Sequence, residues 1–374
     1  MSLNIGLVDA DLLDNGTRHP NLALMKMSGY YKGKNHEVRL INNYNEISNF
    51  DQIFISKVFS FTKINPVINS LKNIGKGGTG FFPEGDKPWL KYEIEHHFPD
   101  YHLYDNYIGE MIEKGRKERS FSDFLHYSIG FTTRGCFRKC DFCVNKRYNK
   151  VIRHAHVSEF FDQSRYGIYL WDDNFLGYQK WEEVLDELED TGKPFQFRQG
   201  LDIRLLDARK IGRVLKTKYH GDFIFAFDYI NEKEIIEKKL TLWRKHTNRT
   251  TKLYILCAFE SQDEVDIINT FERIKVLMKF GCLPYLMRYE NYLNSVHKGL
   301  YIQIARWCNQ PQFYKKMSFR EFCEANQTYH KNKSTFCSSY KAMIDFENIF
   351  PEIAKSYFDL KYENQNQYGK NNEC

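Results

Sequence analysis

Apolar residues follow two different spacings along the 374-residue chain. Short continuous apolar runs alternate with longer segments whose apolar residues lie three or four positions apart. The first spacing is typical of buried strands and the second of amphipathic helices. Near the start of the chain this pattern predicts a helix at 21–32, strands at 4–9, 36–41 and 52–59, and a further apolar segment at 67–74 that leads into the glycine-rich loop 75–80. Such alternation predicts a small parallel α/β domain with its loops at the carboxyl ends of the strands.

The alternation becomes more regular after residue 127. Apolar runs predict six strands, at 127–132, 167–171, 195–199, 223–227, 252–258 and 283–287. Segments of helical length follow the strands, at 157–164, 181–191, 206–217, 232–246 and 263–280. Successive β/α units of this kind predict a parallel, barrel-like sheet with helices outside, short of the eight units of a full barrel.

The regions between and after these segments set the expected domain boundaries. Residues 83–125 are irregular, and the basic run 114–119 marks a linker. From residue 291 onward the pattern is mainly helical. We therefore predict an α/β protein with a Rossmann-like domain at 1–120, a partial (β/α)6 barrel at 121–307 and a helical C-terminal extension at 308–374.

A cysteine motif directly follows the first predicted strand of the barrel. Cys136, Cys140 and Cys143 are spaced C-x3-C-x2-C. Closely spaced thiolates suit a soft metal centre. A ferredoxin run adds a fourth cysteine three residues later, where this chain has Lys146. Three ligands would leave one iron of a four-iron cluster open, and an open coordination position distinguishes catalytic metal sites from structural ones.

This motif, with the aromatic Phe142 directly before its last cysteine, resembles the signature of the radical S-adenosylmethionine (SAM) superfamily. The resemblance implies a 4Fe–4S cluster on the three cysteines, with SAM bound to the open iron and Phe142 beside the cofactor. It implies an enzyme that cleaves SAM reductively to a 5′-deoxyadenosyl radical, which then acts on a substrate that the sequence does not identify. It also implies an open, six-stranded partial barrel, in agreement with the strand pattern.

Polar residues at the ends of the second and third predicted strands are the next candidates. Asp172, Asp173 and Asn174 follow the second strand, where the resemblance implies an acidic motif that binds the amino group of SAM. A carboxylate suits an ammonium group, and helix capping by Asp173 or Asn174 is the alternative.

After the third strand, the run Gln-Gly-Leu-Asp-Ile-Arg is similar to a segment of relatives in the same class. It would place Gln199, Asp202 and Arg204 at the mouth of the barrel. Arg204 would pair there with the carboxylate of SAM or with Asp202. Asp228, Glu260 and Arg288 follow later strands and would complete a polar barrel mouth.

The N-terminal region raises the question of a second cofactor. Many radical SAM proteins carry a domain of this kind, which binds cobalamin in one large class. The ligand pattern D-x-H-x-x-G is absent here, since His19 is followed by no glycine three residues later. We expect a cobalamin-domain-like fold. Cobalamin is a candidate cofactor, but the absence of the ligand pattern argues against it. The loop 75–80 would be a simple turn or would wrap a phosphate or a cofactor tail.

Composition limits the location and the partners. No apolar run reaches the ~18 residues that a membrane span needs, and the N-terminus resembles a first strand rather than a signal peptide. We expect a cytoplasmic protein. The formal charge of +6 permits an acidic partner, and the radical chemistry calls for a flavodoxin- or ferredoxin-type electron donor, for which a basic surface is suitable.

Two other classes of function compete. A factor that modifies or binds nucleic acid (tRNA or DNA) would use the basic segments 114–119 and 244–252 to bind phosphate. A non-catalytic zinc protein would combine the three cysteines with His154 or His156, although neither histidine falls in a common finger spacing. Cysteines outside the motif are widely separated, and we expect buried thiols at Cys257, Cys282, Cys308, Cys323 and Cys337.

Overall fold

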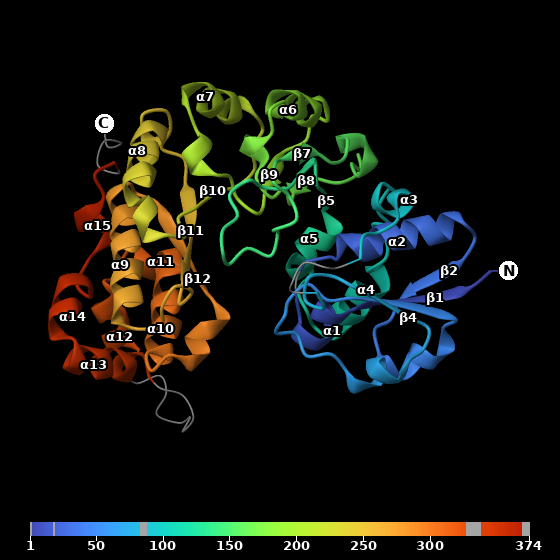
Figure 1. The fold of residues 1–374 in the computed structure, drawn as a ribbon, viewed down its shortest axis with the longest axis horizontal. Helices are drawn as coiled ribbons and strands as arrows, with labels where there is room; N and C mark the ends of the chain where they lie inside the picture. The colour runs from blue at the N-terminus through green and yellow to red at the C-terminus, as the bar shows by residue number, and fades with distance from the viewer. Residues whose placement is uncertain (1, 18, 83–87, 327–337, 369–374) are drawn as a thin grey trace. The chain divides into compact units, whose positions relative to one another are not determined.

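The computed structural model describes residues 2–17, 19–82, 88–326 and 338–368 (Figure 1). The chain forms two compact units. The first comprises residues 1–198 with 218–220, and the second comprises residues 199–217 with 221–374. The domain boundaries expected at residues 120 and 307 stay a prediction.

The first unit begins with a four-stranded parallel sheet in the order β2-β1-β3-β4. Its strands are β1 (Asn4–Asp9), β2 (Glu37–Leu40), β3 (Gln52–Ser56) and β4 (Ile74–Gly77). The helices of this region are α1 (Ala10–Asn15), α2 (Leu22–Gly33), α3 (Tyr92–Glu95), α4 (Asp105–Glu113) and α5 (Ser122–Leu125), with 3-10 helices η1 (Tyr44–Asn49), η2 (Pro66–Ser70) and η3 (Glu118–Phe121). This strand order is that of flavodoxin-like doubly wound sheets, in which ligands bind outside the carboxyl ends of the strands.

The sheet buries apolar residues on both faces. Along β1, Ile5 and Leu7 join one apolar cluster, while Val8 joins another with Ile53 and Ile55. The alternation follows from the two-residue period of a strand. The predicted strands at 4–9, 36–41 and 52–59 and the helix at 21–32 are confirmed.

The structure corrects the prediction for the glycine-rich segment, because residues 74–77 form strand β4 rather than a loop. A Cβ atom at Gly75 would lie 2.7 Å from the ring of Phe54 on the neighbouring strand. The glycine therefore permits close pairing, which a pattern of apolar residues does not reveal.

A second parallel sheet completes the first unit, with the order β5-β8-β9. Its strands are β5 (Tyr127–Gly130), β8 (Gly167–Leu170) and β9 (Phe195–Phe197), and a short antiparallel pair is formed by β6 (Thr133–Arg134) and β7 (Ile152–Arg153). The helices are α6 (Trp181–Asp190) and the 3-10 helices η4 (Val157–Glu159) and η5 (Phe175–Gly177). The helix predicted at 157–164 is wrong, since only η4 forms. Asp162 accepts hydrogen bonds from the main-chain N–H and hydroxyl of Ser164, a local turn that competes with helix.

The second unit contains a three-stranded parallel sheet and most of the helices. Its strands, in the order β10-β11-β12, are β10 (Phe223–Ala226), β11 (Thr251–Cys257) and β12 (Leu283–Arg288). Helices α7 (Ala208–Lys216), α8 (Lys233–Arg244) and α9 (Glu264–Lys279) precede or separate these strands. The C-terminal part adds α10 (Lys298–Cys308), α11 (Pro311–Tyr314), α12 (Phe319–Ala325), α13 (Ser339–Ile349), α14 (Pro351–Tyr357) and α15 (Tyr362–Gln365), and the unit has 3-10 helices η6 (Ile203–Leu205), η7 (Ile230–Glu232) and η8 (Glu290–Asn294).

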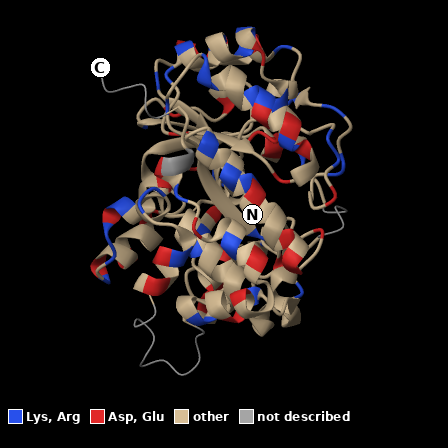
Figure 2. Ribbon diagram, turned by 90° about the vertical axis from the view of Figure 1, so that its left-hand side faces the viewer, with Lys and Arg blue, Asp and Glu red and all other residues tan. Residues whose placement is uncertain are grey.

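All six strands predicted after residue 127 are therefore present, as two parallel sheets of three strands. The helical character of the C-terminal region also agrees with the sequence. Both basic residues (Lys, Arg) and acidic residues (Asp, Glu) lie on the helices (Figure 2). No helix within the described ranges is long and apolar enough to cross a membrane.

The cysteines outside the motif behave as the sequence suggests. Cys257, Cys282, Cys308 and Cys323 are buried and reduced. Burial raises the pKa of each of these thiols above its ordinary value. Cys337 lies outside the described residues.

Candidate metal centre

The cysteine motif lies on a loop whose two ends are held together. Residues 135–151 connect β6 to β7 and contain neither helix nor strand along this fully described stretch. The antiparallel pairing of Thr133 with Arg153 closes the base of the loop. At its start, Gly135 has φ +95°, and a Cβ atom there would lie 2.4 Å from the carbonyl oxygen of Lys150. Only glycine fits this conformation and this close approach.

Main-chain N–H groups donate to the sulfur atoms of two of the three loop cysteines. Cys136, Cys140 and Cys143 are reduced and partly exposed. The Sγ atom of Cys136 accepts a hydrogen bond from the main-chain N–H of Arg138 at 3.3 Å, and that of Cys143 accepts one from Asn145 at 3.4 Å. Burial raises the pKa of the Cys143 thiol, and the Asn145 N–H opposes that shift. Donors aimed at sulfur favour the thiolate form that binds metal.

The charge of the loop also favours an anionic group. Its basic residues outnumber its single acid, Asp141, and they are Arg138, Lys139, Lys146, Arg147 and Lys150. Thiolates and a cluster that they hold carry negative charge. A local excess of positive charge lowers the cost of placing that charge near the surface.

The end of β8 fixes this loop through three consecutive side chains. Asp172 accepts hydrogen bonds from the main-chain N–H groups and from the hydroxyls of both Thr132 and Thr133, at 2.5–3.0 Å. It is 1% exposed. Burial raises the pKa of Asp172, while these four hydrogen bonds oppose the rise. Asp172 is therefore turned wholly toward the end of β5.

The next two residues hold the start of the loop itself. Asp173 accepts a hydrogen bond from the main-chain N–H of Gly135 at 2.7 Å. The side-chain amide of Asn174 donates to Sγ of Cys136 at 3.3 Å. Asn174 precedes η5 without capping it through its side chain, so this structure does not bear out the capping alternative for Asn174.

Asn174 also carries an unusual buried atom. The residue is 3% exposed, and its Oδ1 has no hydrogen-bond partner among the described residues. A buried acceptor without a donor costs about 1–3 kcal/mol. Such an atom next to the cysteine loop marks a place where a ligand donor would be stabilised.

A partly buried carboxylate, missed by the sequence analysis, also contacts the base of the loop. Glu95 on α3 lies 3.0 Å from Nε2 of His154, 3.3 Å from Nζ of Lys26 and 3.9 Å from the guanidinium of Arg134. Burial alone would raise the pKa of Glu95, but the hydrogen bond from His154 and the charges of Lys26 and Arg134 outweigh it and lower the pKa to about 2. No local pattern marks Glu95, because its partners lie far away in the sequence.

These contacts bear on the zinc alternative. His154 hydrogen-bonds to Glu95, and His156 lies 3.4 Å from Glu187. Within the part of the chain that the structure describes, no group of three or more His, Cys, Asp or Glu side chains is placed to hold a metal ion. A four-iron cluster binds its three thiolates through different iron atoms, so those thiolates need not converge on one point. The donor set of the loop fits such a cluster.

The residues predicted after the third strand lie in the second unit. Gln199 is exposed. Asp202 accepts from Nε of Arg204 at 2.7 Å, and Arg204 also pairs with Glu232. Burial disfavours the charge of Arg204, but the pairing with both carboxylates raises its pKa above the ordinary value. Of the two partners expected for Arg204, the internal ion pair with Asp202 is present. The sequence analysis missed Glu232, which comes from a separate segment.

The later strand ends in this unit include one perturbed acid. Asp228 follows β10, and its Oδ1 is buried without a partner among the described residues. Burial raises the pKa of Asp228 to about 6. The guanidinium of Arg273 binds the main-chain oxygen of the same residue. Asp228 is therefore a buried acid next to this sheet whose pKa lies above its ordinary value.

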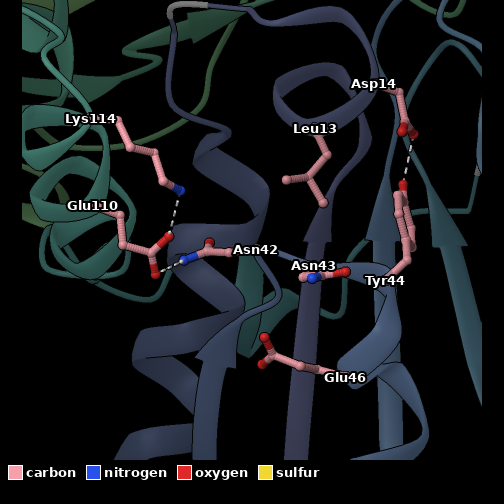
Figure 3. Close-up of a pocket in the computed structure, with 8 residues that line it drawn as sticks. All are labelled: Leu13, Asp14, Asn42, Asn43, Tyr44, Glu46, Glu110 and Lys114. Atoms are coloured by element: carbon pink, nitrogen blue, oxygen red, sulfur yellow. Dashed lines mark hydrogen bonds and ion pairs between the residues drawn. The ribbon is translucent and has the colours of Figure 1, made fainter.

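A separate polar cavity of about 350 Å³ lies in the first unit, beside α1 and α4 (Figure 3). Asp14 accepts from the hydroxyl of Tyr44 at 2.6 Å, and Glu110 accepts from the amide of Asn42 at 3.4 Å. Lys114 lies 3.5 Å from Glu110. The cavity shares no residue with the cysteine loop, and its carboxylates are largely satisfied by their neighbours.

Comparison with known proteins adds a likeness of fold. No family model and no curated protein matches the sequence. Among solved structures, the chain is similar to the radical SAM methyltransferase TsrM from Kitasatospora setae, determined with cobalamin and a [4Fe–4S] cluster bound. The similarity covers 77% of this chain and 75% of that one, with a TM-score of 0.51 and 11% sequence identity. This chain shares the fold of a radical SAM enzyme. At such low identity the likeness extends to the fold alone.

Proposed function

We propose that this protein is a radical SAM enzyme whose 4Fe–4S cluster is held by Cys136, Cys140 and Cys143. The observation that carries the proposal is a closed loop with three partly exposed, reduced thiols, fixed to the end of a parallel strand by Asp172, Asp173 and Asn174. The fold similarity to a radical SAM methyltransferase supports it. When bound, the cluster would supply the electron that cleaves SAM to a 5′-deoxyadenosyl radical and methionine.

The chain's own residues would bind and orient SAM. Asn174 offers a buried acceptor without a partner, and Asp173 is partly exposed next to it. A ligand ammonium would satisfy the Asn174 oxygen and pair with the Asp173 carboxylate. Phe142, half-buried on the loop, would supply an apolar contact.

The proposal also covers the second unit. Asp202 and Glu232 hold the guanidinium of Arg204 in one orientation. The oriented guanidinium would suit the carboxylate of SAM. Gln199, which is exposed and lies a few residues earlier in the sequence, is a further candidate for this contact. We assign residues 1–120, 121–307 and 308–374 to a Rossmann-like domain, a partial barrel and a helical extension. Electrons would come from a flavodoxin- or ferredoxin-type protein.

The first unit lacks the D-x-H-x-x-G pattern that ligates cobalamin. His19, the histidine of the first loop, pairs with Asp123 at 2.6 Å. At the carboxyl ends of β1 and β3, Asp11 accepts from the main-chain N–H of Val58 and from the hydroxyl of Thr62, at 2.5 and 2.6 Å. Asp11 thus links the segments that follow β1 and β3. We propose no cobalamin step.

An anaerobic assay tests the function. The full chain is reconstituted with iron and sulfide, mixed with SAM and dithionite, and analysed for 5′-deoxyadenosine by mass spectrometry. We expect about four iron atoms per chain and product that disappears in Cys140→Ala. Cys323→Ala, which changes a buried cysteine on α12, is the matched control. It should retain both the iron and the formation of 5′-deoxyadenosine. A chain that binds no iron, or product independent of Cys140, would overturn the proposal.

A further inference from the structure

The contact between Asn174 and Cys136 is built into the structure by several independent restraints. Nδ2 of Asn174 lies 3.3 Å from Sγ of Cys136, and the amide is almost fully buried. A thiolate only accepts hydrogen bonds, so the N–H side of the amide faces the sulfur. The position of Asn174 follows from its neighbours, because Asp172 binds both threonines after β5 and Asp173 binds Gly135.

The packing on the other side of Asn174 also fixes the position of its side-chain amide. The N–H of Gly177 donates to the main-chain oxygen of Asn174 at 3.0 Å. A Cβ atom at Gly177 would lie 2.8 Å from the ring of Phe137 and 3.0 Å from Val151. The turn that carries Asn174 therefore packs directly on both ends of the cysteine loop. The packing of its own turn therefore holds the amide against the sulfur.

We infer that Asn174 is a positioning residue that raises the reduction potential of the cluster through its N–H···S bond to Cys136. This inference rests on the proposed function. Reduction adds one negative charge to the cluster and its thiolates. A hydrogen bond to a ligand sulfur stabilises the more negative state more strongly and so favours reduction.

The chemistry of the side chain suits this role. Asparagine donates without adding a charge to a buried position, whereas a lysine there would carry a desolvation cost. Cys136 also accepts from the main-chain N–H of Arg138, which substitution at 174 leaves in place. A variant at 174 therefore removes one of two donors to the same sulfur and leaves the ligand itself unchanged.

The experiment measures the potential of the cluster in the absence of SAM. The reconstituted full chain is titrated with dithionite against redox mediators, and the reduced cluster is followed by electron paramagnetic resonance. The variants are Asn174→Ala, which deletes the donor, and Asn174→Asp, which keeps the shape but replaces the donor with an acceptor. Asn326→Ala is the matched control, because the Asn326 amide donates to a main-chain oxygen on α12 in the second unit.

We expect wild type and Asn326→Ala to share one midpoint potential. Asn174→Ala should shift it to a more negative value, and Asn174→Asp should shift it further, since a carboxylate adds negative charge beside the sulfur. Loss of iron from both Asn174 variants at unchanged thermal unfolding would overturn this inference, because Asn174 would then be needed to keep the cluster bound rather than to set its potential. Equal iron content with unchanged potentials would overturn this inference and leave the proposed function intact. A wild-type chain that binds no iron would overturn both.

Discussion

The Asp173 carboxylate accepts a hydrogen bond from the main-chain N–H of Gly135, with 2.7 Å between Oδ2 and the nitrogen. This bond joins the end of β8 to the residue directly before Cys136. With the bonds of Asp172 and Asn174 to the same segment, it makes the shape of the cysteine loop depend on a strand that lies more than thirty residues away in the sequence. The candidate metal centre is thus a property of two adjacent strand ends rather than of the loop alone.

Gly135→Ala should damage the loop. The alanine would sit at φ +95° and bring its Cβ to 2.4 Å from the oxygen of Lys150. A non-glycine residue at positive φ alone costs about 1–2 kcal/mol, and the clash adds to that cost. We expect a lower free energy of unfolding in urea and a lower iron content after reconstitution. Gly115→Ala is the control, since Gly115 has φ +86° with nothing within 4 Å of a Cβ atom. Equal effects of the two substitutions would contradict the role of the close approach.

Asp172→Asn should destabilise the first unit. The carboxylate accepts from four donors of Thr132 and Thr133, and the amide would turn one donor toward them. Since hydrogen bonds to charged groups contribute about 1.5–3 kcal/mol each, we expect a loss of at least about 2 kcal/mol in urea unfolding. Asp190→Asn, at an exposed position on α6, should have little effect. If Asp172→Asn unfolded at the same urea concentration as wild type, these hydrogen bonds would contribute little to the free energy of unfolding.

Glu95 should make stability depend on pH in the acid range. Its pKa is lowered from 4.5 to about 2 in the folded state, so its contribution is present above pH 4.5 and is lost as pH falls toward 2. Burial lowers the pKa of His154 below 6.5, which adds a loss of stability as pH falls below that value. We expect the wild type to lose up to about 3 kcal/mol through Glu95.

Glu95→Gln tests this assignment by urea unfolding at a series of pH values. The variant should be less stable than wild type at pH 7, because Lys26 loses its partner, and its stability should change less between pH 4.5 and 2. Glu93→Gln, at an exposed position of the same helix, should keep the wild-type profile. Parallel profiles for wild type and Glu95→Gln would rule out Glu95 as the source of the pH dependence.

Arg204→Lys should weaken the binding of SAM if the proposed function holds. Lysine keeps the charge but cannot form the paired contacts that a guanidinium makes with a carboxylate. We expect about a tenfold lower affinity by calorimetry, equivalent to the loss of one good hydrogen bond, at unchanged iron content. Arg209→Lys, on the exposed surface of α7, is the control. An unchanged affinity would mean that Arg204 serves only its ion pairs with Asp202 and Glu232.

Local order along the chain could be predicted from the sequence. Strands such as β1, β5 and β8 are buried along nearly their whole length. A strand buried on both faces appears in the sequence as a mainly apolar run, which can be recognised without knowing its partner strands. The cysteine motif could also be recognised from the sequence, because three cysteines within eight residues form a pattern that does not depend on the fold. The segments that were misjudged are those where a glycine or a local turn overrode the apolar pattern, as at β4 and after η4.

Only the tertiary structure decided the partners of the polar side chains. The sequence placed Asp172, Asp173 and Asn174 together at a strand end. Only the structure showed that they bind four positions after the neighbouring strand, which are Thr132, Thr133, Gly135 and Cys136. No sequence pattern marked Glu95 or Glu232 as a site residue, because their partners come from distant segments. Strand periodicity and motif spacing are set by neighbours in the chain, whereas hydrogen bonds and ion pairs between side chains depend on which segments folding brings together.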